Sequence, residues 1–398
     1  MVIRTKKEDV LITPNDVKPT SKAFQVLGTL NPAAVRLPDG NILLYVRIIE
    51  KLINNEDEKY CYSPRMIGNE NEFKIKIDKF KKDIIDESTD LDFVFKDGTK
   101  RLKFISHFRR MLLDKSGFKI LSIEKNPSFF GTAKDGELGV EDPRITKIDK
   151  LYVMTYVSLS RSQNISTSLA ISTDGYNWSR QGIIFGEQDK DVVVFPEKVN
   201  GRYVAFDRPE GNFMFSQPHI WIGYSNDLKS WGDLKPIADV YEEDGFCPRN
   251  GAGPPPIKTK RGWLLLYHAV TEFKEEENEK EILKKLRKIV RLKENIIKKI
   301  ENFEEQVIKK VTLYSVGGAL FDLNNPEKLI AKSKSFLIVP NSKYDQGTFE
   351  NKRVVFPTGA VVDEKGRDII IFSGSGDTHT TVKRVSLNDI LRALRKVK

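Results

Sequence analysis

The chain has 398 residues, 39% of them hydrophobic, which is enough to bury a substantial core. Its formal net charge is +10, but Lys and Glu are interleaved and no nucleic-acid-binding motif accompanies them, so we expect no nucleic-acid partner. No apolar run approaches the ~20 residues that cross a bilayer, and the N-terminus is too charged for a signal peptide. We therefore expect a cytoplasmic protein with no membrane partner. Cys61 and Cys247 predict neither a disulfide framework nor a metal site.

From Ala33 onward, short runs rich in Val, Ile, Tyr and Phe alternate with Gly, Asp, Asn and Pro. This pattern predicts an all-β fold. The expected strands are Ile42–Ile49, Leu151–Val157, Thr167–Ser172, Val192–Phe195, Tyr203–Asp207, His219–Ser225, Trp263–Ala269, Leu313–Asp322, Ala360–Asp363, Ile369–Gly374 and Thr380–Ser386. Residues 50–126 are expected to form strands with long loops. His107, Arg109 and Arg110 could reach a ligand there, but we expect them to solvate a loop.

The stretch Gly136–Arg144 carries two adjacent carboxylates, a proline and an arginine just before a predicted strand. Carboxylates next to an arginine are typical of carbohydrate sites, although a structural Asp–Arg pair would have the same sequence. In an extended segment, neighbouring side chains point to opposite faces, so Glu141 and Asp142 are not expected to share a pocket. Pro143 is expected to hold Asp142 in an extended conformation.

The segment Ser172–Trp178 recurs as Ser225–Trp231. In both, a strand ends in Ser, Asp begins a turn, and a Trp packs back, which is typical of a β-hairpin. The two copies lie 53 residues apart. Repetition at a period of about 40–50 residues indicates propeller blades, each of which needs its neighbours to bury its faces. The alternative is a pair of unrelated surface hairpins.

Residues 273–310 differ from the rest of the chain in lacking Gly and Pro. Apolar residues fall there at alternating three- and four-residue steps, with Lys293 interrupting one apolar position: Ile282, Leu286, Ile289, Ile296, Ile300, Phe303 and Val307. The pattern predicts a helical insertion, either a helical hairpin or one long helix. Because an exposed apolar stripe needs a partner, we expect the insertion to mediate a homo-oligomer.

Six motifs occur in one order along most of the chain: Asn31–Ala34, Leu43–Arg47, Gly139–Arg144, Phe195–Lys198, Gly251–Pro256 and Val355–Gly359. Together they resemble the motif series of glycoside hydrolase family 130, the β-mannoside phosphorylases and related mannosidases. The resemblance implies one catalytic domain over residues 1–398, a five-bladed β-propeller with its active site at the central axis and residues 273–310 inserted in it.

The same resemblance implies roles for particular residues. Asp142 is the expected catalytic acid, protonating the leaving oxygen directly or through the sugar 3-hydroxyl. The expected substrate-binding residues are Asn31, Arg47, Arg144, Asp377 and Glu197. The expected phosphate-binding residues are Arg249, His268, Lys190 and Arg208.

Inverting hydrolysis of a glycoside needs an acid and a second carboxylate that activates water, whereas phosphorolysis replaces the second carboxylate by cations that bind phosphate. The basic residues at the matched positions favour inverting, reversible phosphorolysis of a β-1,4-mannosyl sugar, releasing α-mannose 1-phosphate. Phosphate is then a co-substrate, and neither a metal nor another cofactor is expected. The alternatives are a β-mannosidase that uses Glu197 or Glu350 as its second acid, and a propeller that binds glycans without cleaving them.

Overall fold

The computed structural model describes residues 2–210, 218–237, 249–273, 311–341, 343–346 and 352–397. The expected helical insertion, except for Phe273, lies outside these ranges, as do Cys247 and Glu350. The oligomer that the insertion was expected to mediate therefore stays a prediction.

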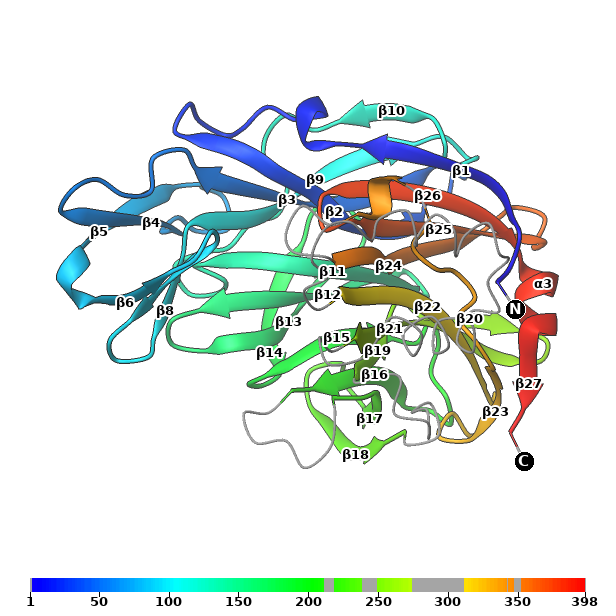
Figure 1. Ribbon diagram of the computed structural model, residues 1–398. Coiled ribbons are helices and arrows are strands. Elements are labelled where there is room, and N and C mark those ends of the chain that lie inside the picture. The colour runs from blue at the N-terminus through cyan, green and yellow to red at the C-terminus, as the bar shows by residue number, and fades with distance from the viewer. Residues whose placement is uncertain are drawn as a thin grey trace.

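The all-β prediction is confirmed for the described residues (Figure 1). Their one α-helix is α3 (Leu387–Ala393), and three short 3-10 helices accompany it: η1 (Pro14–Asp16), η2 (Lys82–Ile84) and η4 (Lys343–Asp345). In these ranges no helix has both the length and the apolar character needed to span a membrane. Each expected strand in the list above overlaps an observed one, because Val-, Ile- and aromatic-rich runs suit a pleated sheet.

Three antiparallel sheets of four strands follow one another along the chain. The first contains β2 (Phe24–Arg36), β3 (Ile42–Leu52), β9 (Phe104–Leu113) and β10 (Ile120–Ile123). The second contains β11 (Gly139–Ile148), β12 (Leu151–Ser160), β13 (Asn164–Ser172) and β14 (Ser179–Phe185). The third contains β15 (Asp189–Val194), β16 (Tyr203–Pro209), β17 (Trp221–Ser225) and β18 (Trp231–Pro236).

A larger sheet holds the remaining long strands. Its members are β1 (Thr5–Ile12), β19 (Arg249–Ala252), β20 (Ile257–Thr259), β21 (Gly262–Phe273), β22 (Val311–Phe321), β23 (Leu329–Ser333), β24 (Lys352–Val362), β25 (Asp368–Ser375), β26 (His379–Ser386) and β27 (Leu394–Lys396). It contains two antiparallel runs of four strands, β19-β21-β22-β23 and β24-β25-β26-β1, joined by the parallel pairing of β22 with β24. The first strand of the chain thus completes the run that contains β26.

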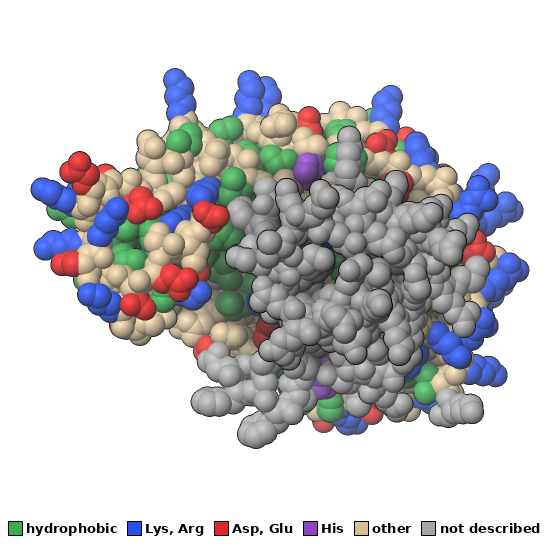
Figure 2. All heavy atoms as spheres, in the orientation of Figure 1, with side chains coloured by type: hydrophobic (Ala, Val, Ile, Leu, Met, Phe, Trp, Pro, Cys, Tyr) green, Lys and Arg blue, Asp and Glu red, His purple; other side chains and the backbone are tan. Residues whose placement is uncertain are grey.

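Between β3 and β9 the chain forms two small sheets that lie together at one side of the molecule (Figure 1). They contain β4 (Tyr60–Met66) with β5 (Ile75–Lys81), and β6 (Ile85–Ser88) with β7 (Asp92–Phe95) and β8 (Lys100–Leu102). On the face seen in Figure 2, acidic and basic side chains are interspersed over this part.

The expectation that His107 and Arg109 solvate a loop is wrong. Both lie in β9 and are buried, and both bind Glu50, at 3.1 Å from His107 Nε2 and 3.0 Å from Arg109 NH2 to Glu50 Oε1. Glu50 also accepts hydrogen bonds from the backbone N–H and hydroxyl of Thr20. A buried carboxylate needs such partners, so this cluster stabilises the interior of the first sheet.

The repeated Ser-x-Asp turn is confirmed. Ser172 donates to Asp174 at 2.8 Å and Ser225 donates to Asp227 at 3.0 Å, each at the turn between the third and fourth strands of its sheet. In both turns the Asp Oδ1 also accepts two backbone N–H groups. The same residues therefore make the same turn at equivalent places in two sheets.

The tryptophan that follows each turn packs against the preceding sheet. Trp178, from the second sheet, donates its indole N–H to Tyr45 of the first at 2.8 Å. Trp231, from the third sheet, packs on Phe185 of the second with ring centroids 5.5 Å apart. Further buried clusters lie between sheets, and each buried aromatic or aliphatic side chain contributes ~1.5–3 kcal/mol.

Candidate active site

Two predicted site residues, and one residue next to a predicted one, each lie at a bulge in the first strand of a sheet. Asn31 in β2, Asp142 in β11 and Asp191 in β15 have φ values of 47°, 48° and 56°, and the strand register shifts at each. Asn and Asp adopt this left-handed conformation more readily than other residues with a Cβ. A bulge re-aims a side chain, and here it turns short polar side chains toward a shared site.

The Asp142 carboxylate is held by two donors from the first sheet. Its Oδ1 accepts from Asn31 Nδ2 at 2.8 Å and from Arg47 NH1 at 3.1 Å. Among the described residues Oδ2 has no hydrogen-bond partner, and the side chain is 18% exposed. One oxygen is thus fixed while the other can reach a ligand.

Two expectations about this stretch are wrong. Glu141 and Asp142 were expected to face opposite ways, yet Arg47 NH2 binds Glu141 while NH1 binds Asp142. Asp142 was expected to be extended before Pro143, but it is left-handed. The bulge between Glu141 and Arg144 adds residues to the strand and breaks the simple alternation of side chains.

Sharing one guanidinium affects the proton affinity of Glu141. Burial raises the pKa of Glu141, Arg47 opposes this rise, and the adjacent Asp142 adds to it, leaving the pKa above its ordinary value. A carboxyl group in such a pair retains a proton more readily than an isolated one. Glu141, which lies beside Asp142, therefore has the chemistry of a proton donor.

Arg144 does not take the substrate-facing place expected for it. It is buried, with NH2 2.8 Å from Asp191 Oδ1 and NH1 donating to the backbone carbonyl of Asp142 at 2.9 Å. Its Nε donates to the Gly253 carbonyl at 3.3 Å. Arg144 thus joins the second and third sheets behind Asp142.

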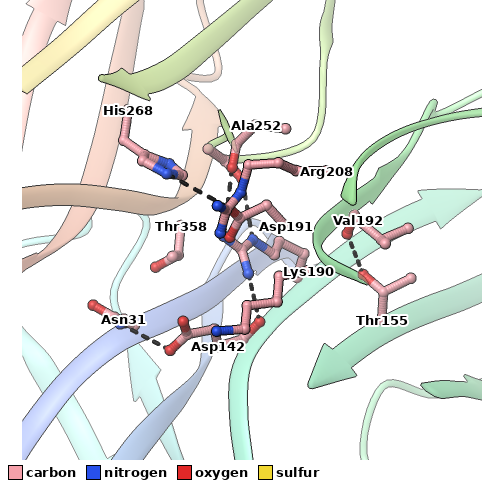
Figure 3. Close-up of polar contacts among 12 residues, drawn as sticks. Asn31, Asp142, Thr155, Lys190, Asp191, Val192, Arg208, Ala252, His268 and Thr358 are labelled. Carbon is pink, nitrogen blue, oxygen red and sulfur yellow. Dashed lines mark hydrogen bonds and ion pairs between the residues drawn. The ribbon is translucent and has the colours of Figure 1, made fainter. Parts of the chain in front are cut away.

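Asp191 gathers the cationic part of the site. Besides Arg144, its carboxylate accepts from Arg208 Nε at 2.8 Å and lies 3.5 Å from His268 Nε2. A Cβ on Gly251 would come within 2.3 Å of Asp191 Oδ2, so glycine is required there. Figure 3 shows Asp191, Arg208 and His268 together, with Asp142 and Asn31 opposite and Lys190 extending toward Asp142.

The ionisation of this cluster follows from burial and from its neighbours. Burial would raise the pKa of Asp191, but Arg208, His268 and Arg144 outweigh it and hold that pKa well below its usual range. Burial lowers the pKa of His268 to about 3. Asp191 opposes this fall in pKa, and the neighbouring arginines add to it. His268 is therefore a neutral ring near pH 7, and its buried Nδ1 has no hydrogen-bond partner in the described parts of the chain.

Three further predicted residues lie at the same place. Arg249 donates to the Tyr314 hydroxyl at 2.6 Å, and the Tyr314 ring stacks on His268. Lys190 acts electrostatically on Glu141. Burial raises the pKa of Asp377, a rise that Lys352 and Arg47 oppose and Asp142 reinforces. Although the Asp377 side chain is exposed to solvent, enough protein surrounds it to desolvate its charge.

Glu197 does not join the site. Its carboxylate is exposed and pairs with Lys258. Phe195, two residues earlier, is fully buried, and the chain has left β15 by this point. The structure thus places Glu197 at the surface just after β15 and does not bring it to the other predicted site residues.

Several members of the site were not predicted from the sequence. No role was expected for Glu141, Asp191 or Tyr314, although Asp191 directly follows Lys190 and ends the segment Asp189–Asp191. Asn31 and Asp142 both precede a proline inside a strand, and proline within a sheet is confined to edges and bulges. That signal could have indicated the bulges.

Gly374 in β25 offers a test of how Asn31 holds Asp142. A Cβ at Gly374 would lie 1.9 Å from Asn31 Oδ1, so Gly374→Ala must push the Asn31 amide away from Asp142. We expect kcat/KM to fall at least about tenfold, because a misplacement of ~1 Å can cost up to ~10²-fold. The control is Gly232→Ala, where no atom lies within 4 Å of the added Cβ. Equal kcat/KM for both variants would contradict the positioning role of Asn31.

Comparison with known proteins agrees with this geometry. The sequence model of glycoside hydrolase family 130, described as β-1,4-mannooligosaccharide phosphorylase, matches residues 110–286 and 287–396. A β-1,2-mannobiose phosphorylase of Listeria innocua is 29% identical over 405 residues, covering 99% of each chain. A 1,2-β-oligomannan phosphorylase of a Thermoanaerobacter species is 32% identical over 281 residues, covering 70% of this chain and 78% of that protein.

A solved structure is similar over the same extent. The β-1,2-mannobiose phosphorylase of Listeria innocua, in complex with β-1,2-mannobiose, has a TM-score of 0.75 at 28% identity and covers 96% of each chain. The chain therefore belongs to glycoside hydrolase family 130. Within that family it is a glycoside phosphorylase, in agreement with a carboxyl pair set beside a cluster of cations.

Proposed function

We propose that this enzyme catalyses reversible, inverting phosphorolysis of a β-1,2-mannoside, with release of α-mannose 1-phosphate. The sequence motifs favoured a β-1,4 linkage, and the family model that matches this chain is described by that linkage too. The two relatives described above and the similar solved structure act on or bind β-1,2-linked mannosides. Their coverage of this chain, up to 99%, is the observation that supports β-1,2.

In this proposal Asp142 is the acid. The bond from the sugar C1 to the leaving oxygen breaks as a phosphate oxygen bonds to C1 from the opposite face. A proton passes from Asp142 to the leaving oxygen, directly or through the sugar 3-hydroxyl, and the hydrogen phosphate gives up a proton to restore the balance. Asn31 and Arg47 fix Oδ1, which leaves Oδ2 to act.

Phosphate would be held by the basic groups next to the carboxyl pair: Lys190, Arg208, Arg249 and His268. Arginine offers a fork of donors that matches phosphate oxygens, and lysine adds a point charge. The neutral His268 ring can donate one hydrogen bond without adding charge. These groups orient the nucleophile, so no second carboxylate is needed to activate water.

We also propose that the five runs of four antiparallel strands are the blades of a five-bladed propeller. The first strands of neighbouring runs contact one another: β2 with β11 and β24, β11 with β15, and β15 with β19. Asn31, Asp142, Asp191 and Arg249 all lie on these first strands. This arrangement would place the site on the central axis.

The linkage is tested by incubating the enzyme with β-1,2- or β-1,4-mannobiose and phosphate. We expect kcat/KM on β-1,2-mannobiose to be higher by at least about tenfold, since contacts that only the correct linkage makes are worth ~1–3 kcal/mol. Phosphorus NMR should identify the product as the α-anomer. Preference for β-1,4-mannobiose would overturn the linkage, and mannose release that does not need phosphate would overturn phosphorolysis.

A further inference from the structure

A carboxylate lies among the cations to which we assign phosphate binding. Glu210 directly follows β16, and its Oε2 is 3.3 Å from Arg208 NH1 and 3.7 Å from Lys190 Nζ. Its Oε1 is 3.5 Å from Arg249 NH1. Three of the four expected phosphate-binding residues thus share one carboxylate, and the sequence analysis assigned Glu210 no role.

The distances indicate electrostatic pairing without close hydrogen bonds. An N–H···O hydrogen bond normally spans ~2.7–3.2 Å, so all three contacts are longer. Arg208 NH1 is buried and has no hydrogen-bond partner among the described residues. Because the Glu210 side chain is 21% exposed, it lies where the cations meet solvent. An anion that binds these cations must therefore lie next to the carboxylate.

We propose that Glu210 makes the site selective for hydrogen phosphate over oxyanions that carry no proton. This inference rests on the phosphorolysis proposed above. An ionised carboxylate only accepts hydrogen bonds, so it can face an oxyanion only if that oxyanion donates. At neutral pH hydrogen phosphate retains one O–H, which can donate to Glu210 while its other oxygens accept from Lys190, Arg208 and Arg249.

Sulfate has the same shape and charge but no proton. If sulfate bound to the same cations, one of its oxygens would face a Glu210 carboxylate oxygen. Both oxygens are acceptors, and no proton would lie between the two negative charges. Building such repulsion against the wrong ligand is a general route to specificity. Glu210 is therefore a specificity-determining residue, and the cations alone would bind both anions.

The test compares phosphate and sulfate in wild type and Glu210→Gln. The readouts are the KM for phosphate and the Ki of sulfate as a competitor in phosphorolysis. We expect the ratio of Ki(sulfate) to KM(phosphate) to fall at least about tenfold in Glu210→Gln, since hydrogen bonds to charged groups are stronger than those between neutral groups. The amide can donate to sulfate, which removes the repulsion. Sulfate should then also raise the Tm of the variant more than that of wild type.

Two controls isolate the charge at this position. Glu124→Gln removes an exposed carboxylate that directly follows β10 and pairs with Arg110 of β9 at 3.1 Å, and it should leave the ratio unchanged. Glu210→Asp keeps a carboxylate and should keep the ratio within about threefold of wild type. An unchanged ratio in Glu210→Gln would overturn the selectivity role.

The two proposals fail in different ways. If wild type releases mannose without phosphate, the proposed phosphorolysis fails. If wild type requires phosphate but Glu210→Gln discriminates against sulfate as strongly as wild type does, only the role of Glu210 fails. The Tm shifts with phosphate and sulfate measure binding without turnover and decide the second question independently.

Discussion

An Asp142→Asn variant is expected to lose at least ~10²–10⁴-fold in kcat for phosphorolysis, the contribution typical of a general acid. The asparagine amide cannot protonate the leaving oxygen. It can, however, accept from Asn31 and Arg47 through its oxygen and adopt the left-handed φ of 48°, so the fold should survive. Steady-state kinetics with circular dichroism as a folding check measures both.

The matched control for this change is Asp233→Asn. Asp233 is also left-handed, with a φ of 51°, and also pairs with an arginine, Arg202, but it is exposed on β18. We expect Asp233→Asn to leave kcat within about twofold of wild type, since exposed ion pairs contribute only ~0–1 kcal/mol to stability. Near-normal turnover by Asp142→Asn would show that another group supplies the proton, and Glu141 would be the next candidate.

Asp191→Asn is expected to have the largest effect on stability. The change leaves the buried Arg144 and Arg208 without their shared counter-charge, and breaking a buried ion pair in this way costs ~3–5 kcal/mol. We also expect the KM for phosphate to rise at least about tenfold, because Arg208 and His268 lose the group that orients them. Urea unfolding and phosphate-dependent kinetics measure the two effects.

The same variant has a pH signature. The pKa of Asp191 is lower in the folded protein than the ~3.9 of an unfolded chain. Its stabilising effect is therefore fully present above pH ~3.9 and is lost as the pH falls toward the lower folded value. The difference in unfolding free energy between wild type and Asp191→Asn should shrink below pH ~4. A loss under ~1 kcal/mol at pH 7, like that expected for Asp233→Asn, would contradict the role of Asp191.

Much of the fold follows from local pattern. Runs such as Leu151–Val157 and Ile369–Gly374 are strands because branched and aromatic side chains suit a pleated, buried surface. The Ser-x-Asp turns at Ser172 and Ser225 form from hydrogen bonds within a few residues, so they are readable in the sequence. The motif resemblance brought Asn31, Arg47 and Asp142 together correctly, and it is the arrangement of the sheets that makes their contacts.

What the sequence by itself determined is thus many of the strands, two of the turns and most of the polar residues of the site. The tertiary structure decided which further residues join them. Glu141 joins Asp142 because a bulge cancels the alternation of side chains, while Glu197 is left at the surface. Arg144 binds Asp191, and Arg249 approaches Glu210, because different sheets lie against one another, and such contacts depend on packing between segments far apart in the chain.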